Sequence, residues 1–166
     1  GSQLFDNNDL AIDLQRVAVD VFDYLDGQAP ADIVFVGILT NGVFFAKRVQ
    51  EKLNKMDKPI TTPIMELDIS LYRDDISAKK DYMSVVKNNN LLFNLDGKHV
   101  VLFDDVLSTA RTARAALNAI FDYGRPQKVS FVVLYDRQNR QVPIEPNVVG
   151  KVLDVDFKYR VNVGFI

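Results

Sequence analysis

Apolar runs of strand length alternate along this chain with segments whose apolar residues recur at helical spacing. Because parallel strands need crossover connections, which are usually helices, this alternation predicts an α/β fold with a parallel sheet flanked by helices. The crossovers are expected to be right-handed. The apolar runs are residues 32–38, 61–72, 98–103 and 128–135, and the helical segments are residues 10–25, 43–53 and 111–123.

The length of the chain bounds the number of domains. At 166 residues, the chain is long enough for one hydrophobic core and short for two domains of ordinary size. Gly1 and Ser2 resemble the remnant of a cleaved tag, so we expect a single domain over residues 3–166. Apolar residues make up 48% of the chain and charged residues 25%, as in ordinary globular proteins.

Two absences in the sequence exclude several classes of function. The chain has no cysteine, which rules out disulfides, thiolate nucleophiles and thiolate zinc sites and predicts a cytoplasmic location. No apolar run approaches the length of about eighteen residues that a membrane span needs. The net charge of −2 gives the chain no general attraction to nucleic acid.

One long polar segment interrupts the alternation of strands and helices. Residues 73–90 carry many charges and little apolar periodicity. So long a segment inside a compact domain is typical of a functional lid or a disordered loop, and we expect a flexible lid here. Arg73, Lys79, Lys80 and Lys87 would then close over an anionic ligand, or they form an ordinary solvated loop.

Two adjacent carboxylates, Asp104 and Asp105, follow the apolar run of residues 98–103 directly. Like charges repel, so an acid pair at the end of a buried strand indicates an external ligand. The hydroxyl-rich residues 108–112 then open a helix, and free N–H groups at a helix N-terminus bind anions. Together the acids and this turn predict a sugar-phosphate site, in which the acids accept hydrogen bonds from ribose or meet magnesium through water.

Polar residues follow two other predicted strands, and ligands bind beyond the carboxyl ends of strands in open parallel sheets. Thr40 and Asn41 either bind an anion there or form a plain turn before a helix. Asp136 and Arg137 either face a ligand or pair with each other. His99, the only histidine, begins a strand and is expected to be structural.

The stretch VVLFDDVLSTART, residues 100–112, resembles the phosphoribosyl pyrophosphate motif of type I phosphoribosyltransferases. Its pattern is four apolar residues, two acids, two apolar residues and a small hydroxyl-rich loop. Further stretches, among them LYRDD at residues 71–75 and GRPQKV at residues 124–129, are similar to the PyrR family. Members of that family regulate pyrimidine operons and in many bacteria are also uracil phosphoribosyltransferases.

The resemblance implies transfer of phosphoribose to uracil, giving UMP, with Mg²⁺ brought in with phosphoribosyl pyrophosphate and no metal held by the protein alone. Asp104 and Asp105 would hold the ribose hydroxyls, and Arg73 in the lid would assist catalysis. The remaining implied contacts are Thr40 and Asn41 to pyrophosphate and Asp136 and Arg137 near the base. The 5′-phosphate would be held by Ser108, Thr109, Ala110, Arg111 and Thr112, and Val106 and Leu107 would also bind the substrate.

Four residues depart from what the resemblance leads us to expect. Asn41 stands where these proteins usually have arginine, which removes a cationic contact to pyrophosphate. Ala110 stands in place of a glycine, and its methyl group can crowd the phosphate. Gln138 and Asn139 replace a usual glycine and histidine. These departures weaken the expectation of catalysis more than that of the fold.

The sequence leaves several functions open. The chain is a uracil phosphoribosyltransferase, a UMP-responsive regulator of pyrimidine genes, or both; the alternatives are a non-catalytic nucleotide sensor and a phosphoribosyltransferase for another base. The resemblance implies a homodimer or higher homo-oligomer. RNA binding is possible but disfavoured, because residues 1–40 contain seven acids and only one basic residue, Arg16.

Overall fold

The computed structural model describes residues 6–74, 81–86, 93–156 and 159–165. Helices and strands alternate along most of this chain. A short 3₁₀ turn at Pro30–Asp32 precedes the first strand. The helices are α1 (Asn7–Tyr24), α2 (Asn41–Leu53), α3 (Ile69–Asp74) and α4 (Arg111–Tyr123); the strands are β1 (Ile33–Ile38), β2 (Ile64–Leu67), β3 (Met83–Val85), β4 (His99–Leu107), β5 (Lys128–Asp136) and β6 (Val148–Val152).

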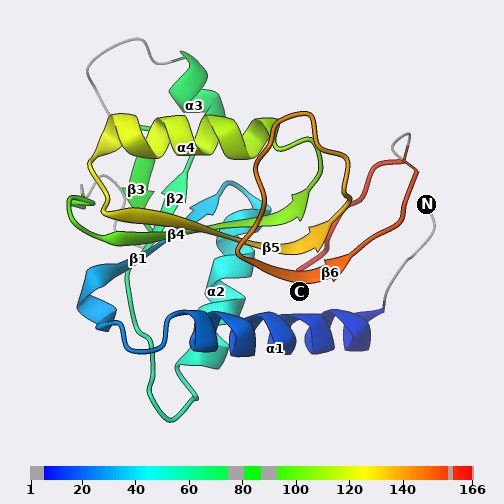
Figure 1. The fold of residues 1–166 in the computed structure, drawn as a ribbon, viewed down its shortest axis with the longest axis horizontal. Coiled ribbons are helices and arrows are strands. Elements are labelled where there is room, and N and C mark those ends of the chain that lie inside the picture. Colours follow the sequence, from blue (N-terminus) through cyan, green and yellow to red (C-terminus); the bar gives the residue numbers. More distant parts are fainter. Residues whose placement is uncertain (1–5, 75–80, 87–92, 157–158, 166) are drawn as a thin grey trace.

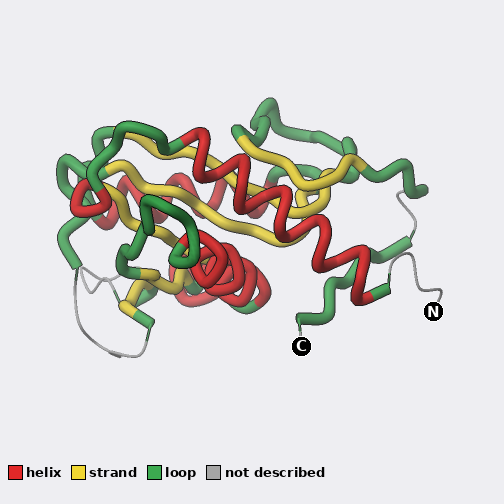
Figure 2. Tube along the Cα trace, turned by 90° about the horizontal axis from the view of Figure 1, so that it is seen from below, coloured by secondary structure: helices red, strands yellow, loops and turns green. Residues whose placement is uncertain are grey.

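The strands form one sheet in the order β3-β2-β1-β4-β5-β6. All neighbouring pairs are parallel except β2 and β3. Helices α1 and α2 cover one face of the sheet, and α3 and α4 cover the other (Figure 1). In Figure 2, which views the molecule from below, α1 crosses in front of the sheet. The predicted α/β class, with a mostly parallel sheet between helices, is therefore confirmed.

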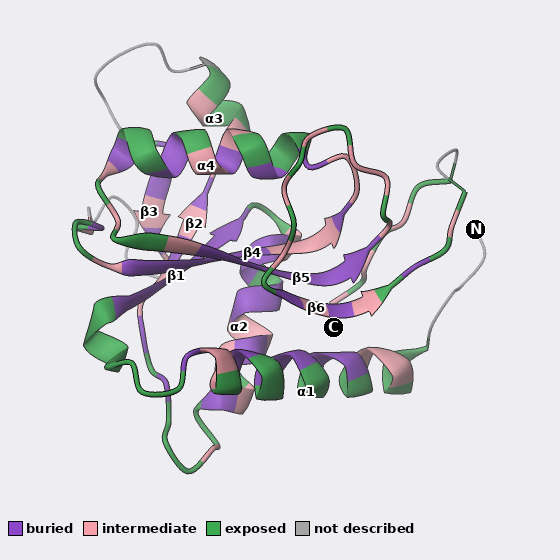
Figure 3. Ribbon diagram, in the orientation of Figure 1, coloured by how far each residue is buried: buried purple, intermediate pink, exposed green. Residues whose placement is uncertain are grey.

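The hydrophobic core lies in two layers, one on each face of the sheet (Figure 3). Side chains alternate along β1, so Val34 and Val36 pack on the α4 side and Ile33 and Phe35 on the α2 side. All six residues of β1 are buried because the strand is central and covered on both faces. This burial explains why the central strands read as continuous apolar runs.

One local expectation was wrong, and two strands were not predicted. Residues 69–72, expected as strand, begin α3, because the Asp68 carboxylate accepts a hydrogen bond from Leu71 N at 2.9 Å and caps a helical turn. The expected lid contains strand β3, which pairs antiparallel with β2. Strand β6 was not expected, although it extends the sheet beside β5.

The described part of the chain contains no helix long and apolar enough to span a membrane.

Candidate functional site

Strands β1 and β4 are adjacent in the sheet, and their connections leave in opposite directions along it. Such a reversal point is where ligands bind in open parallel sheets. It brings the start of α2 to the end of β4, where Asn41 Nδ2 donates to Asp105 Oδ2 at 3.1 Å. The approach is close, because a Cβ atom on Gly42 would lie 2.5 Å from the carbonyl oxygen of Phe103. Glycine is therefore required at residue 42 for α2 to reach β4.

The acid pair is half-buried at the last residues of β4. Burial raises the pKa of Asp104 well above its usual value, and the negative charge of Asp105 raises it further. The backbone N–H of Asp105 donates to Asp104 Oδ1 at 3.0 Å, which opposes this rise only in part. Hydrogen-bond donors or cations that arrive with a ligand would stabilise the charged form of Asp104 and offset this rise.

The C-terminal segment reaches the same corner of the molecule. Asn41 Nδ2 also donates to the carbonyl oxygen of Val163, at 3.2 Å. Two residues later, the ring of Phe165 stacks on that of Phe45 in α2, with centroids 6.4 Å apart. Both hydrogens of the Asn41 amide are thus engaged within the protein, one by the acid pair and one by the C-terminal segment.

Residues 108–110 connect β4 to α4 and form the turn that is predicted to bind phosphate, called the phosphate turn below. Thr109 Oγ1 accepts a hydrogen bond from Arg111 N at 3.2 Å, and α4 begins at Arg111 as expected. Ala110 has φ of +73° and Gln138 has φ of +61°. Among the described residues, these are the only non-glycine residues with positive φ, and both stand where the resemblance leads us to expect glycine. At both positions the backbone therefore has a conformation that favours glycine, although the residue is not glycine.

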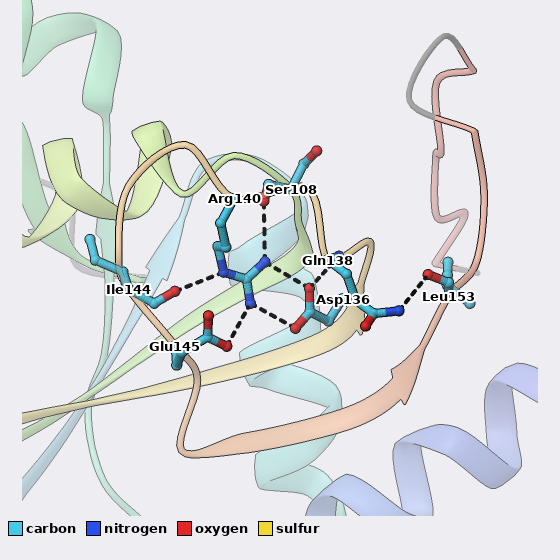
Figure 4. Close-up of polar contacts among 7 residues, drawn as sticks. All are labelled: Ser108, Asp136, Gln138, Arg140, Ile144, Glu145 and Leu153. Atoms are coloured by element: carbon cyan, nitrogen blue, oxygen red, sulfur yellow. Dashed lines mark hydrogen bonds and ion pairs between the residues drawn. The ribbon is translucent and has the colours of Figure 1, made fainter.

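Asp136 and Arg137 do not pair with each other. Asp136 instead forms a two-pronged ion pair with Arg140, whose Nη1 and Nη2 lie 2.8 and 2.7 Å from the two carboxylate oxygens (Figure 4). Burial alone would raise the pKa of Asp136, but the bonds from Arg140 and from Gln138 N outweigh it and lower the pKa. Arg137 donates through Nη2 to the carbonyl oxygen of Asp156 at 2.9 Å, and its buried Nε has no partner among the described residues.

Arg73 is not brought to the acid pair by any described contact. It lies exposed in the last turn of α3. The neighbouring Tyr72 donates to Asp122, at the end of α4 that lies about 16 Å along the helix from Arg111. The role of Arg73 therefore stays a prediction. Lys79, Lys80 and Lys87 lie outside the described residues.

Val106 and Leu107, two residues predicted to bind the substrate, face the hydrophobic core. Leu107 is buried in the layer beneath α4, and Val106 packs against the layer on the opposite face. The carbonyl oxygen of Leu107 accepts a hydrogen bond from Arg137 N at 2.8 Å. We infer that Val106 and Leu107 fix the strand end, whereas Ser108, Thr109 and Thr112 remain accessible to a ligand.

Sequence reasoning missed two contributors to this site. Arg140 lies in the loop after β5, where no periodicity marks its importance; the only signal was its spacing of four residues from Asp136. Val163 acts through its backbone, which sequence cannot reveal. Both are found only once the chain is folded.

Comparison with known proteins places the chain in a family. The phosphoribosyl transferase domain family matches residues 1–163. The chain is 39% identical over 163 residues to the bifunctional protein PyrR of Limosilactobacillus reuteri, covering 98% of this chain and 90% of that protein. It is 40% identical over 151 residues to the bifunctional protein PyrR of Pseudomonas syringae pv. tomato, covering 91% and 85%.

Solved structures agree on the fold. A hypoxanthine-guanine phosphoribosyltransferase from Bacillus anthracis matches with a TM-score of 0.64 and 18% identity, covering 95% of this chain and 85% of that one. The hypoxanthine phosphoribosyltransferase of Trypanosoma cruzi matches with a TM-score of 0.66 and 20% identity, covering 92% and 82%. With the acid pair, the phosphate turn and the sequence relatives all in agreement, the chain belongs to the PyrR family of phosphoribosyltransferase-fold proteins.

Proposed function

We propose that this protein transfers the phosphoribosyl group of phosphoribosyl pyrophosphate to N1 of uracil, releasing pyrophosphate and giving UMP. The observation that carries the proposal is the acid pair, Asp104 and Asp105, which lies two residues before a turn at a helix N-terminus, beside the reversal point of the sheet. Carboxylates accept hydrogen bonds from ribose hydroxyls, and N–H groups at a helix N-terminus bind phosphate.

In this proposal, the bond from C1′ to the pyrophosphate oxygen breaks as the bond from uracil N1 to C1′ forms. The electron pair of the broken bond leaves with pyrophosphate, and the N1 proton of uracil passes to water. The transition state is oxocarbenium-like, so catalysis depends on holding ribose against the acid pair and on stabilising the leaving group. No side chain needs to act as a nucleophile. Asp136 and Arg137 at the end of β5 would lie near the base.

The donor set fits a magnesium ion that the substrate holds. No group of three or more metal-binding side chains occurs in the described ranges. Magnesium usually keeps several waters and binds one or two carboxylates together with substrate phosphates, which matches the pair of Asp104 and Asp105. When bound, the ion would neutralise charge on the departing pyrophosphate.

The test is an assay of phosphoribosyl pyrophosphate turnover with uracil, hypoxanthine, guanine and orotate as alternative acceptors. We expect UMP from uracil and no product from the other three bases. Product from a purine or from orotate alone would replace uracil in the proposal with that base. Binding of UMP without any turnover would favour the second candidate, a non-catalytic nucleotide sensor.

One observation favours that second candidate. Asn41 is neutral, and its amide hydrogens already bind Asp105 and the Val163 carbonyl. Of the described residues at the start of α2, Thr40 is exposed and carries only a hydroxyl group. This corner therefore offers a departing pyrophosphate little positive charge, so we expect the transferase to be slow.

We further propose that RNA binding is weak. The outward face of α1 carries Asp20 and Asp23, both exposed, and Asp26 follows just beyond the helix. RNA affinity rests on lysine and arginine contacts to phosphates, which such a face cannot provide. A gel-shift titration with a pyrimidine operon leader at physiological salt should show no tight binding, even with UMP. Nanomolar binding stimulated by UMP would contradict this.

We also propose that the protein forms a homodimer or higher homo-oligomer. Sedimentation of the protein would test this.

A further inference from the structure

Arg140 is the most fully bonded polar side chain near the proposed site. Its Nε donates to the carbonyl oxygen of Ile144 at 2.8 Å, and its Nη2 reaches Glu145 Oε2 at 3.1 Å in addition to Asp136. Its Nη1 is shared between Asp136 and the carbonyl oxygen of Ser108, which lies 3.2 Å away (Figure 4). An arginine has five N–H donors, and these five contacts account for all of them. Arg140 therefore has no donor left with which to bind a phosphate itself.

The contact with Ser108 orients the phosphate turn. Because a trans peptide is planar, its C=O and N–H groups point in opposite directions. When Arg140 holds the carbonyl oxygen of Ser108, the N–H of Thr109 is turned away from the loop of residues 138–145. The next carbonyl, that of Thr109, is held by the same loop through Gln141 N at 2.9 Å and Val142 N at 3.2 Å.

This second pair of contacts turns the N–H of Ala110 away from the loop as well. Among the described residues, neither Thr109 N nor Ala110 N has a hydrogen-bond partner. Side-chain contacts support the same arrangement, since Asn139 Nδ2 donates to Ser108 Oγ at 3.3 Å and Arg111 Nε donates to Gln141 Oε1 at 2.6 Å. The loop after β5 thus holds the carbonyl side of the turn and leaves its N–H side unpaired.

We propose that Arg140 is a positioning residue, which anchors the loop after β5 to Asp136 and thereby presents the N–H groups of Thr109 and Ala110 to the 5′-phosphate. This inference rests on the proposed phosphoribosyl site but not on the identity of the base. Arg140 acts through the backbone of Ser108 and does not touch the ligand. Its positive charge is balanced by Asp136 and Glu145, so its contribution is geometric.

The probe is ribose 5-phosphate, titrated into ¹⁵N-labelled protein while the amide signals of Thr109 and Ala110 are followed. In the parent protein, both signals should shift on binding. In R140Q, the dissociation constant should rise at least about tenfold, with the shifts of these two amides reduced, because the orienting contact to Ser108 is lost. R140K should recover part of the affinity, since an ammonium group can still reach one or two of the acceptors.

Two further variants separate positioning from folding. E145Q removes only the exposed partner of Arg140 and should leave both affinity and melting temperature unchanged. The double variant D136N/R140Q removes both charges of the buried pair, so its melting temperature should recover relative to R140Q while its affinity for ribose 5-phosphate stays weak. If affinity instead followed melting temperature through all the variants, Arg140 would be structural only.

The outcomes for the inference and for the proposed function can be told apart. Unchanged ribose 5-phosphate affinity in R140Q would overturn the positioning role while leaving the site in place. Failure of the parent protein to bind ribose 5-phosphate would overturn both the site and the role. Binding of ribose 5-phosphate that weakens in R140Q, without turnover of uracil, would support the role and overturn only the proposed reaction.

Discussion

At the amino ends of β4 and β5, His99 and Ser130 form a chain of neutral hydrogen bonds with Tyr24 and Gln28. At the carboxyl ends of the same strands lie Asp104, Asp105 and Asp136, which are all acids. The amino-end chain is closed: Tyr24 can donate to Ser130, Ser130 to His99 Nε2 and His99 Nδ1 to Gln28. Burial lowers the pKa of His99, helped by the charge of Lys128, and so favours the neutral ring that this chain requires.

The carboxyl end is satisfied only in part. Asp136 has Arg140 as its partner, but the pKa of Asp104 is raised, and Asp105 is contacted by the neutral amide of Asn41 and by no cation among the described residues. A closed network of neutral groups stabilises a fold. An acid pair without a cation lowers stability until a ligand supplies its partners, which is how a binding site differs from a structural cluster on the same two strands.

The largest expected effect comes from removing the acids. D104N/D105N should weaken magnesium-dependent binding of phosphoribosyl pyrophosphate by about a hundredfold or more, because two charged acceptors are lost. The free energy of unfolding should not fall, since the buried carboxyl of Asp104 already has a raised pKa. Calorimetry and denaturant unfolding measure the two quantities. Unchanged affinity would remove the acid pair from the site.

The opposite pattern is expected at the amino end. S130A leaves Tyr24 and His99 without their shared partner and should lower the free energy of unfolding by about 2 kcal/mol. Ligand affinity should not change, because the network lies at the other end of β4. Y24F, which removes a single donor, is the milder matched variant. If a fully folded sample of S130A bound the ligand more weakly, the amino and carboxyl ends of the strands would be energetically coupled.

Substitution of Asn41 by arginine should supply a cation next to the acid pair at the carboxyl end of β4. N41R adds a cation that can keep the contacts to Asp105 and the Val163 carbonyl and still reach the leaving group, so uracil turnover should rise about tenfold or more. Steady-state kinetics with N41Q as the neutral control tests this. If N41R is no faster than N41Q, the missing charge does not limit the reaction.

The smallest effect concerns the two glycine-like backbones. Q138G should raise the free energy of unfolding by up to about 1 kcal/mol, because Gln138 is exposed and its φ of +61° favours glycine. A110G should gain less, since the methyl group of Ala110 is buried and its packing would be lost. Urea unfolding of both variants gives the comparison. A destabilised Q138G would show that the side chain of Gln138 stabilises the loop after β5.

The central architecture could be predicted because buried parallel strands read as uninterrupted apolar runs, and the acids stood out because they end one of them. Short elements could not. Strand β3 has three residues and α3 has six, and the signal for α3 was a single capping side chain, Asp68. Strand β6 is only partly buried, so its apolar pattern is weak.

The ion pair at the end of β5 shows why site details escape sequence reasoning. Asp136 is followed directly by Arg137, so a pair between the two was one of the two interpretations of this segment. Instead, Gln138 N donates to Asp136 Oδ1 at 2.8 Å, φ at Gln138 is positive, and Arg140 contacts the carboxylate. Neither the positive φ of Gln138 nor the contact across four residues could be inferred from the residue types.

The position of Asn41 bears on the order in which the protein folds. Its two hydrogen bonds join residues separated by 64 and 122 positions in sequence, whereas Arg140 and Asp136 are only four apart. Long-range contacts form slowly because loop closure must precede them. During synthesis, Asn41 can meet Asp105 as soon as β4 has emerged, but its second bond must wait for Val163. The amide of Asn41 is thus fixed at both of its hydrogens only after all the strands of the sheet have been synthesised.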